Sequence, residues 1–592
     1  MKKEKAKRII DEFELHHNHS WFDELYQRNR DTLDDTALFY RRNHISYKTM
    51  FDRMRLLAAA MQAAGVKKGT EIPVCLSNSP ELVYVMGAAS MLGAVINIFS
   101  ATFPLDYIEE ILKGCDKCIG FFEDNHYALI HTAVDAVGLK RCVLCSLSDS
   151  LPSDASALTM DGCEYVCFES SVKLWTAHSA CNVSFYDFLH QGEVKESIFQ
   201  ETISLDDAFS VTYTSGSTNA LRPKAIVQRA RSFCVIGRFH DPDVMHGMKF
   251  KKIRGLAMIP PHSNTDLISS ISDTLMQGAV LAMEPVYHER FFLYALLLNK
   301  PNFVSATRSF WIAAVKRLQT EEGYKNTKLP FLLFAFAVGE ELNGNEEKFL
   351  NKALRKADAG RDFHHLPLSP FCFSVAGGDC EHGSILYRLF RAATSFSFNP
   401  ASEKQYGMKP FDFVDVAVLD SQGNQLGCNR VGRLVANSPC TMKCYKNDPA
   451  ATEAFFIQDN NGNTWGDMSV FGYMDKAGRV YMRNRILDND ERIPPFKIAD
   501  EILRCRSLLS CEVVKVDEKY IAHIEFMPNY KNGPKEELRK AKRSVEKRFG
   551  ESVSSSLLFR IHSGTYSFPL TGSGKRDIKA LIAEGKNNAF SV

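Results

Sequence analysis

A loop rich in hydroxyl side chains follows a run of small and apolar residues in the middle of the chain. It reads Tyr213-Thr-Ser-Gly-Ser-Thr-Asn-Ala-Leu-Arg-Pro-Lys224. Backbone N–H and side-chain O–H groups in such a loop donate to phosphate oxygens, and Lys224 adds a positive charge. A Ser/Thr-rich surface turn has the same composition. Composition alone therefore leaves a phosphate-binding loop and a surface turn as equal alternatives.

A second candidate lies near the end of the chain, where Phe568-Pro-Leu-Thr-Gly-Ser-Gly-Lys575 places a lysine on a Gly/Ser-rich loop. A lysine on a flexible loop can bring a positive charge to a site where negative charge develops. The segment is not a Walker P-loop, because it lacks the first glycine at the required spacing and has Arg576 where Ser or Thr would bind magnesium. A solvated turn is the other interpretation.

Alternating strands and helices must position these two loops. The chain has 592 residues, 45% apolar and 24% charged, which is ordinary for a globular protein and long enough for several domains. Apolar positions at helical spacing in 45–65 and 80–92 predict helices. Short apolar runs predict strands at Ile72–Leu76, Ala94–Ile98, Phe209–Tyr213, Gly255–Ile259 and Phe331–Ala335. This alternation is typical of an α/β fold with a mostly parallel sheet covered on both faces.

The pattern changes near Phe411. Alternating runs in 414–419, 432–436 and 479–482, separated by Gly- and Asn-rich turns, predict an antiparallel, barrel-like β subdomain. The last part of the chain is charged and mixed, with a strong helix pattern over 535–549. The stretch 146–196 is rich in Ser, Asp and Thr and predicts loops over a packed body. A polar run near 485–490 predicts a hinge, which divides the chain into residues 1–484 and a C-terminal domain of residues 485–592.

The charge balance and hydropathy exclude some partners. Lys and Arg number 72 against 70 Asp and Glu, so the formal charge of +2 gives no reason to expect a nucleic acid or a membrane surface as partner. The longest uncharged stretch, Val83–Leu105, is interrupted by Gly87, Gly93, Asn97 and Pro104. Because a span needs about 20 mainly apolar residues, we expect a buried helix and strand there and no membrane span.

Four of the 16 cysteines form two CxxC pairs, Cys115-Asp-Lys-Cys118 and Cys142-Val-Leu-Cys145. This spacing allows a zinc ribbon. Against that reading, Cys118-Ile-Gly-Phe-Phe and Arg141-Cys-Val-Leu-Cys look like short core strands, in which a cysteine serves as a small apolar residue. We favour the core interpretation. The start of the chain is basic and amphipathic and lacks the apolar core of a secretory signal, so we expect reduced cysteines and a cytoplasmic protein.

The hydroxyl-rich loop resembles the phosphate-binding signature of the AMP-forming synthetases, which include acyl- and aryl-CoA ligases, firefly luciferase and the adenylation domains of nonribosomal peptide synthetases. The chain keeps Thr214, Ser215, Gly216, Ser217, Thr218, Pro223 and Lys224 of that signature. It departs by an insertion around Asn219–Arg222 and by Ala225 in place of the last glycine. Further similar segments follow in the family's order: Ile45-Ser-Tyr-Lys, Tyr406-Gly-Met-Lys-Pro, Gly432-Arg-Leu, Met442-Lys-Cys-Tyr-Lys-Asn-Asp-Pro449 and the Lys575 loop.

The resemblance implies a role for each matching residue. Lys575 is the expected catalytic lysine, and His262 is expected to line the acyl pocket, although a lone histidine is equally a structural residue. Glu381 is expected to hold Mg²⁺, since a carboxylate suits a magnesium ion that bridges phosphates. The expected ATP- and AMP-binding residues are Thr214, Ser215, Gly216, Ser217, Thr218, Lys224, Gly378, Cys380, Glu381, Asp467 and Arg485, with Asp467 on the ribose hydroxyls. Gly377 and Cys380 replace the family's aromatic and hydroxyl residues.

The fold implied is a large N-terminal region of two α/β subdomains plus a β-barrel-like subdomain, with a small mobile α+β C-terminal domain. The implied activity is an ATP-dependent carboxylate ligase that forms an acyl-adenylate and then an acyl-CoA thioester, with ATP, Mg²⁺ and CoA as cofactors and substrates. Ser263 stands where amino-acid-activating relatives have an aspartate, so a fatty or aryl acid is expected.

The segment after Arg485 departs most from the family. Arg485 and Arg492 are closer together than usual, the glycine between them is missing, and Lys497 replaces a glutamate. Two alternatives therefore stay open: an adenylation enzyme that loads a separate carrier protein or an amine, and a nucleotide-binding homologue without catalysis.

Overall fold

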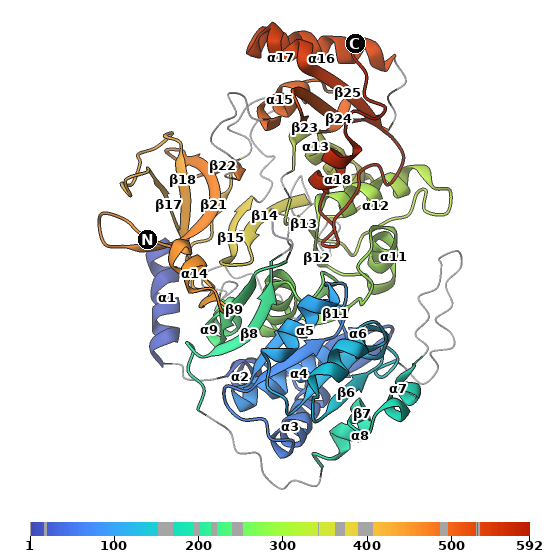
Figure 1. Cartoon of the computed structure of the whole chain (residues 1–592), viewed down its shortest axis with the longest axis vertical. Coiled ribbons are helices and arrows are strands. Elements are labelled where there is room, and N and C mark those ends of the chain that lie inside the picture. The colour runs from blue at the N-terminus through green and yellow to red at the C-terminus, as the bar shows by residue number, and fades with distance from the viewer. Residues whose placement is uncertain are drawn as a thin grey trace.

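The computed structural model describes residues 2–16, 20–151, 170–193, 202–214, 222–238, 253–340, 342–360, 373–388, 407–485, 495–528, 530 and 533–592. Two large sheets with their helices form the lower part of the molecule, a smaller β unit lies beside them, and a C-terminal domain lies on top (Figure 1). The N-terminal helices α1 (Lys2–His16) and α2 (Trp21–Asn29) pack against this lower part.

An eight-stranded sheet carries the phosphate loop. Its order is β19-β9-β8-β4-β3-β5-β6-β7, and the strands from β8 to β7 run parallel. The strands are β3 (Glu71–Cys75), β4 (Val95–Ile98), β5 (Gly120–Glu123), β6 (Cys142–Cys145), β7 (Asn182–Ser184), β8 (Ala208–Tyr213), β9 (Ala225–Arg229) and β19 (Cys444–Tyr445). The residues of β4, β5 and β6 are all buried, as expected for parallel strands covered on both faces.

One helix of this sheet, α4 (Pro80–Leu92), begins and ends where the sequence signals predict. The helix is buried at every residue, with Pro80 in its first turn and Gly93 at its C-cap in the left-handed conformation. It is preceded by α3 (Tyr47–Ala63) and followed by α5 (Leu105–Lys113), α6 (Asp124–Val137), α7 (Val172–His178) and α8 (Phe185–His190). No helix among the described residues is long and apolar enough to cross a membrane.

A nine-stranded sheet packs beside the first, in the order β16-β15-β14-β13-β12-β10-β11-β1-β2. Its strands are β1 (Thr36–Tyr40), β2 (Asn43–Ser46), β10 (Arg254–Ala257), β11 (Val280–Met283), β12 (Phe303–Ala306), β13 (Phe334–Ala337), β14 (Phe373–Asp379), β15 (Gly383–Arg388) and β16 (Lys409–Pro410). Its helices are α9 (Ala230–Val235), the π-helix η3 (Thr265–Ser272), α10 (Asp273–Met276), α11 (Glu289–Asn299), α12 (Arg308–Thr320) and α13 (Gly344–Lys356). The two large sheets give the two predicted α/β subdomains.

The β unit beside them is an antiparallel sheet in the order β17-β18-β21-β20, with β22 paired to β21. Its elements are β17 (Asp415–Leu419), β18 (Gly432–Asn437), α14 (Pro449–Phe455), β20 (Phe456–Gln458), β21 (Thr464–Met474) and β22 (Val480–Arg485). The predicted strands are present. Among the described strands they form a branched sheet without the pairing that would close a barrel.

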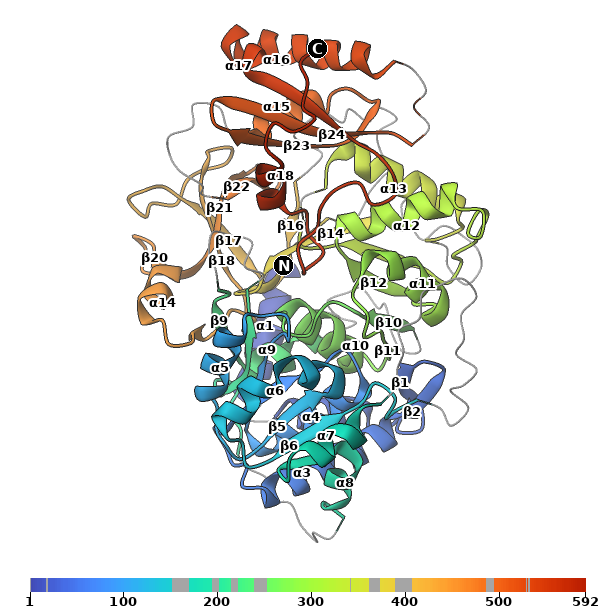
Figure 2. The same cartoon turned by 45° about the vertical axis from the view of Figure 1, so that its right-hand side comes forward.

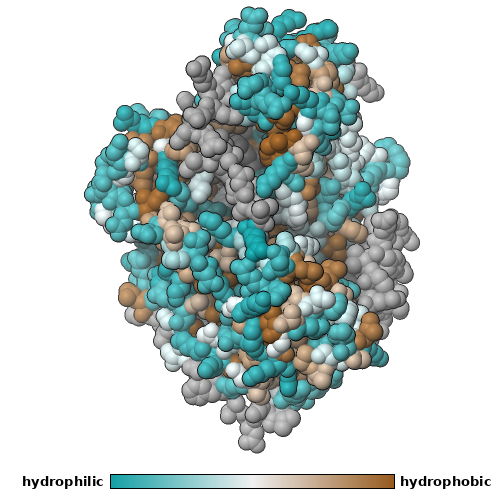
Figure 3. All heavy atoms as spheres, in the orientation of Figure 1, coloured by the Kyte–Doolittle hydropathy of each residue, from teal (hydrophilic) through white to brown (hydrophobic). Residues whose placement is uncertain are grey.

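The C-terminal domain is a three-stranded sheet with α15 (Pro495–Ile502) and α16 (Pro534–Phe549) on one face and α18 (Ile578–Glu584) on the other. Its strands are β23 (Leu508–Val516), β24 (Lys519–Phe526) and β25 (Leu557–His562), and it also contains α17 (Glu551–Ser556). Apolar side chains of α15 and α16 pack on one face of the sheet. Because α16 buries only Leu538, Ala541 and Val545, its outer side is hydrophilic, as the top of the molecule in Figure 3 shows.

The other face of this small sheet lies toward the N-terminal region and is polar except where Val514 and Ile521 pack on Leu581 of α18. Since side chains alternate along strands, Glu512, His523 and Glu525 share this face with Arg560 and His562 across the strand register. The segment between β25 and α18 leaves this face and runs down beside β12 and β14 (Figure 2). This segment carries Lys575.

Two predictions need correction, and a third lies outside the described residues. The strand predicted at 331–335 is β13 at 334–337, because Leu332 is buried in a turn that precedes the strand. The stretch 146–196 is not only loop, since it contains α7, α8 and the edge strand β7, while 152–169 and 194–196 lie outside the described residues. The hinge predicted at 485–490 also lies almost entirely outside them, with only Arg485 at the end of β22 described.

The core interpretation of the cysteines agrees with the fold. Cys142 and Cys145 are three residues apart on one strand, so they point to opposite faces and pack in two different cores. Two side chains on opposite faces of a sheet cannot bind one metal ion. Cys115 is buried and its thiol donates to the carbonyl of Ile111 at 3.3 Å.

Candidate active site

The stem of the predicted phosphate loop is closed by Thr214 and Lys224. The N–H of Thr214 donates to the carbonyl of Lys224 at 3.0 Å, and the N–H of Lys224 donates to Thr214 Oγ1 at 3.0 Å. These bonds continue the antiparallel ladder of β8 and β9 by one residue pair. Ser215, Gly216, Ser217 and Thr218 lie outside the described residues. The structure therefore fixes where the loop leaves and re-enters the sheet.

Tyr445 connects Lys224 to Glu381. The Lys224 ammonium lies 4.5 Å from the centre of the Tyr445 ring, and the Tyr445 hydroxyl donates to Glu381 Oε1 at 2.8 Å. Tyr445 comes from β19, which pairs with β9, the strand that follows the phosphate loop. The structure thus brings two predicted site residues together through a third that the sequence analysis did not single out. Its only signal was an aromatic residue inside a matching segment.

Glu381 lies in the turn between β14 and β15. The N–H groups of Glu381 and His382 donate to Asp379 Oδ1 at 3.1 and 2.7 Å, which closes the turn. The carbonyl of Cys380 accepts hydrogen bonds from the side-chain amides of Gln228 and Asn264, so the turn is tied to the phosphate-loop sheet. Cys380 therefore contributes its backbone rather than its thiol to this connection.

Close contacts explain why glycine occupies two positions of this hairpin. A Cβ at Gly378 would lie 2.1 Å from the carbonyl oxygen of Gly383 on the paired strand, so no side chain fits there. A Cβ at Gly377 would meet the Met408 side chain at 3.1 Å. Met408 thus occupies the space that an aromatic residue at position 377 would enter.

The electrostatics of the turn leave Glu381 short of positive charge. Asp379 is paired with the buried His382, whose Nδ1 lies 2.9 Å from both carboxylate oxygens. Burial raises the pKa of Glu381 above its ordinary value, and the nearby Asp379 carboxylate raises it further. A carboxylate whose charged form is disfavoured in this way gains from a cation placed beside it.

Asp467 lies on β21, opposite Val435 of β18, and is 9% exposed. Arg433 donates to both of its carboxylate oxygens, from Nε at 3.1 Å and from Nη2 at 2.6 Å. The sequence analysis did not foresee this partner, because it depends on the pairing of two strands. Arg485 ends β22 opposite Val470, and its side chain lies outside the described part of the chain.

His262 follows β10 and lies at the foot of the phosphate loop, where its carbonyl accepts the N–H of Tyr213 at 3.0 Å. Its ring packs edge-on against Phe103, with 5.6 Å between centres, and Phe103 also contacts Tyr107 and Tyr213. Burial lowers the pKa of His262 to about 4, so its ring is neutral near pH 7. His262 thus belongs to an aromatic cluster beside the loop.

The loop that carries Lys575 is docked on the N-terminal region. The Tyr287 hydroxyl donates to the carbonyl of Ser573 at 3.0 Å, and the Thr307 hydroxyl donates to the carbonyl of Gly574 at 2.8 Å. Gly339 follows β13 with φ of +75°, and a Cβ there would lie 3.0 Å from Lys575 Cε. Because β13 pairs with β14, the Lys575 side chain lies at the same end of this sheet as the Glu381 turn.

The residue after Lys575 anchors this arrangement through a buried charge network. Arg576 is 7% exposed, and its guanidinium donates to Glu346 and Glu512 at 2.9 and 2.8 Å. Its N–H donates to Glu340 at 2.8 Å. Arg308 at the start of α12 pairs with the same Glu512. Carboxylates of both the N-terminal region and the C-terminal domain therefore hold the backbone next to Lys575.

A comparison with family models decides the family. Residues 25–446, more than half of the chain, match the model described as AMP-binding enzyme. The chain belongs to the AMP-binding enzyme family. It is similar to 4-coumarate–CoA ligase 2 of Oryza sativa subsp. japonica, with 24% identity over 89% of this chain and 86% of that protein.

Two solved structures share the fold of this chain. The anthranilate CoA ligase AuaEII in complex with anthranoyl-AMP matches with a TM-score of 0.71 and 14% identity, covering 96% of this chain and 97% of that one. The amide bond synthetase McbA from Marinactinospora thermotolerans matches with a TM-score of 0.68 and 14% identity, covering 96% and 100%. The predicted α/β fold with a small α+β C-terminal domain is confirmed, as is the resemblance to adenylate-forming ligases of the AMP-binding enzyme family.

Proposed function

We propose that the chain is an ATP-dependent carboxylate ligase that forms an acyl-adenylate and pyrophosphate and then transfers the acyl group to CoA. The observation that carries the proposal is the docking of the Lys575 loop at the end of the sheet that holds the Glu381 turn. The stem of the phosphate loop reaches this turn through Tyr445. A loop for phosphates, a carboxylate and a lysine from a separate domain thus converge in one region.

Each residue has a role in this proposal. Lys224 and the hydroxyl-rich loop bind the ATP phosphates, Asp467 and Arg485 bind the ribose, and His262 lines the acyl pocket. The pocket of a fatty or aryl acid suits a neutral His262 ring packed against Phe103. Ionised at neutral pH, this ring would instead favour a second negative group on the acid.

Glu381 fits a magnesium ion. Burial and Asp379 both raise its pKa, and Tyr445 is a neutral partner, so a divalent cation would supply the missing positive charge. When bound, Mg²⁺ would neutralise phosphate oxygens.

The adenylation step joins a carboxylate oxygen of the acid to the α-phosphorus of ATP as the bond to pyrophosphate breaks. Lys575 neutralises the negative charge that two anions bring together, and this stabilisation is largest in the transition state. The docked Arg576 holds the backbone beside Lys575, so little reorganisation is needed when the substrates bind.

Pyrophosphate exchange tests adenylation. A panel of carboxylic acids is supplied with ATP, Mg²⁺ and labelled pyrophosphate, and we expect exchange with a fatty or aryl acid. Absence of exchange with every acid, together with normal ATP binding by calorimetry, would instead support a nucleotide-binding homologue without catalysis.

The assignment of CoA as the acyl acceptor rests on a further proposal. Residues 485–592 would move relative to residues 1–484 between the two half-reactions. The hinge sequence lacks the usual glycine, which leaves fewer conformations at positive φ. A few residues of any type can absorb such a rotation. We therefore expect single-turnover experiments to show adenylate accumulating before acyl-CoA appears. Adenylate that CoA never consumes would favour the second candidate, transfer to a carrier protein or an amine.

A further inference from the structure

Three side chains with metal-binding atoms meet in the C-terminal domain, away from the proposed active site. His523 comes from the middle of β24, His562 from the end of β25, and Glu584 from the end of α18. One ligand atom of each lies within 4.8 Å of the others, and no other such group of three occurs in the described ranges. His523 Nδ1 lies 2.9 Å from His562 Nε2 and 3.9 Å from Glu584 Oε2.

The hydrogen bond on the far side of His562 fixes its tautomer. His562 Nδ1 lies 2.8 Å from the carbonyl oxygen of Ser567. A carbonyl only accepts, so Nδ1 carries the proton and Nε2 presents a lone pair toward His523. Histidines that bind metals in proteins are oriented in this way, with the second ring nitrogen donating to a carbonyl or carboxylate.

His523 is fully buried, and its Nε2 has no hydrogen-bond partner among the described residues. The ring nitrogen that faces His562 and Glu584 is Nδ1, so Nδ1 is the His523 atom of the candidate ligand set and Nε2 lies outside it.

We propose that His523, His562 and Glu584 bind one Zn²⁺ ion. Two nitrogens and one carboxylate oxygen are ligands that zinc accepts, with water in the fourth position. With Zn–N bonds of about 2.0–2.1 Å, tetrahedral ligand atoms lie roughly 3.3 Å apart. The two nitrogens would move apart slightly, and Glu584, whose Oε2 lies 3.9 Å from His523 Nδ1, would move closer by rotation of its partly exposed side chain.

The neighbouring charges set the affinity. Arg560 lies on the same strand as His562, and its guanidinium is 3.0 Å from Glu584 Oε2. This cation opposes a metal ion, while a carboxylate with two oxygens can serve both partners. Arg576 and Glu512 face the pair from the lysine loop and β23. Removing the Arg560 charge should therefore tighten zinc binding.

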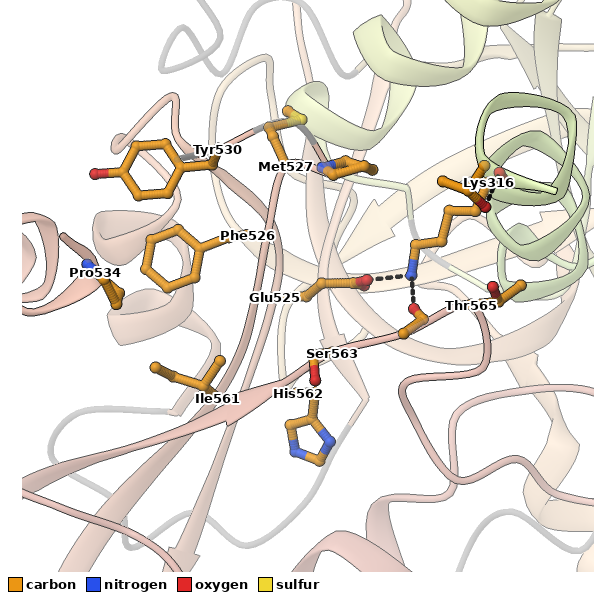
Figure 4. Close-up of a pocket in the computed structure, with 13 residues that line it drawn as sticks. Lys316, Glu525, Phe526, Met527, Tyr530, Pro534, Ile561, His562, Ser563 and Thr565 are labelled. Atoms are coloured by element: carbon orange, nitrogen blue, oxygen red, sulfur yellow. Dashed lines mark hydrogen bonds and ion pairs between the residues drawn. The ribbon is translucent and has the colours of Figure 1, made fainter. Parts of the chain in front are cut away.

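A cavity lies next to the site. This cavity, of about 480 Å³ between α12 and the C-terminal domain, is lined by His562 together with Lys316, Glu525 and Ile561 (Figure 4). Lys316 points into this cavity and forms a buried ion pair with Glu525. His562 is the one proposed ligand among the residues that line this cavity.

The position of the site determines what a bound ion would stabilise. His562 is the last residue of β25 before the Lys575 segment, and Glu584 ends the helix that follows it. An ion bound by both would join the two ends of that segment to His523 of the central strand. Zinc would therefore stabilise the base of the loop without contacting the proposed substrates, and its binding does not depend on ligase activity.

The test is a titration of the chelator-treated full-length protein with ZnCl₂ in a calorimeter. We expect wild type to bind one ion that Glu584→Gln and His562→Gln each bind at least about tenfold more weakly. Arg560→Gln should bind it more tightly. His190→Ala removes an exposed histidine far from the site and should match wild type. A second readout is the thermal midpoint, which zinc should raise in wild type and His190→Ala but not in Glu584→Gln.

Equal zinc affinity and stoichiometry in wild type, Glu584→Gln and His562→Gln would overturn the proposal and assign any zinc binding to cysteines elsewhere. So would the absence of zinc binding by wild type. Because Glu584→Gln changes one partly exposed carboxylate, circular dichroism before the titration confirms that the variant is folded.

Discussion

Arg433 on β18 donates to both carboxylate oxygens of Asp467 on the neighbouring strand β21. The proposed ribose acceptor is therefore already oriented and charge-compensated before any nucleotide binds. The Ser469 N–H also donates to Asp467 Oδ1 at 2.9 Å. An ionised carboxylate has about four acceptor sites, so about one stays open for a ribose hydroxyl.

We expect Asp467→Ala to weaken ATP and AMP binding by about 1–3 kcal/mol, the usual loss for hydrogen bonds to a charged group. Titration calorimetry measures both affinities. Asp420→Ala is the matched control, because Asp420 is a turn carboxylate of the same β unit that makes only local hydrogen bonds in the described structure. Unchanged nucleotide affinity in Asp467→Ala would place the ribose contact elsewhere.

Lys575→Ala should lower the rate of adenylate formation by about 100-fold or more, as expected for removal of one preorganised charge from a transition state. ATP affinity should change little, because this charge acts mainly when the carboxylate attacks. The measurements are pyrophosphate exchange and calorimetry. Lys579→Ala, on the exposed side of α18, is the control and should retain full exchange. Exchange at the wild-type rate in Lys575→Ala would remove Lys575 from the proposed mechanism.

Arg576→Met tests the buried network beside Lys575. The change leaves Glu346, which is fully buried, with the longer Arg308 contact at 3.5 Å as its remaining ion pair, beside hydrogen bonds from Ser510 and the Asn343 N–H. Breaking a buried pair costs about 3–5 kcal/mol, so we expect a lower thermal midpoint. We also expect kcat for adenylation to fall by roughly 10- to 100-fold because the lysine loop is displaced.

Arg548→Met provides the comparison for that variant, since Arg548 forms an ion pair with Glu501 in the same domain but is 45% exposed. Exposed pairs contribute at most about 1 kcal/mol. A drop in kcat as small for Arg576→Met as for Arg548→Met would show that the network does not position Lys575.

Glu381→Gln should separate stability from binding. Burial raises the pKa of Glu381, so its ionised form destabilises the folded protein, and this cost disappears as the pH falls through the folded pKa. At neutral pH the neutral glutamine should therefore leave the thermal midpoint unchanged or raise it. Magnesium-dependent ATP binding should fall in the same variant. A lower midpoint with full magnesium-dependent binding would contradict both the assigned electrostatics and the metal role.

Asp266 in η3 gives a prediction for pH. Burial raises the pKa of Asp266 to about 8 in the folded protein. Between the unfolded pKa of about 3.9 and this value, the folded state retains a proton that the unfolded state has lost, so stability falls as pH rises. The slope is at most about 1.4 kcal/mol per pH unit and ends above the folded pKa.

Asp266→Asn removes this slope. We expect the variant to gain stability relative to wild type between pH 5 and 8, with a constant difference above that range, measured by denaturant unfolding at each pH. Asp52→Asn, at an exposed position on α3, should follow wild type. Parallel curves for wild type and Asp266→Asn would mean that Asp266 is ionised in the folded protein.

Local patterns along the chain predicted most elements of the fold. The helix α4 has the predicted bounds, and β3, β4, β8 and α16 differ from their predictions by about one residue at an end. These elements depend on apolar periodicity and on Pro and Gly signals within a few residues. The short strand β7 was missed because it lies at the edge of the sheet inside a polar segment. Its sequence therefore has no run of apolar residues that would predict a strand.

The sequence by itself determined the alternation of strands and helices, the ordered motifs of the AMP-binding enzyme family, and the presence of a lysine on a Gly/Ser loop. Each of these features depends on residues that are close to one another in the chain. Only the tertiary structure decided that Arg433 lies on Asp467, that Tyr445 joins Lys224 to Glu381, and that His523, His562 and Glu584 meet. These contacts depend on strand register and on how the C-terminal domain packs, which the summed burial of many distant side chains sets and no local spacing encodes.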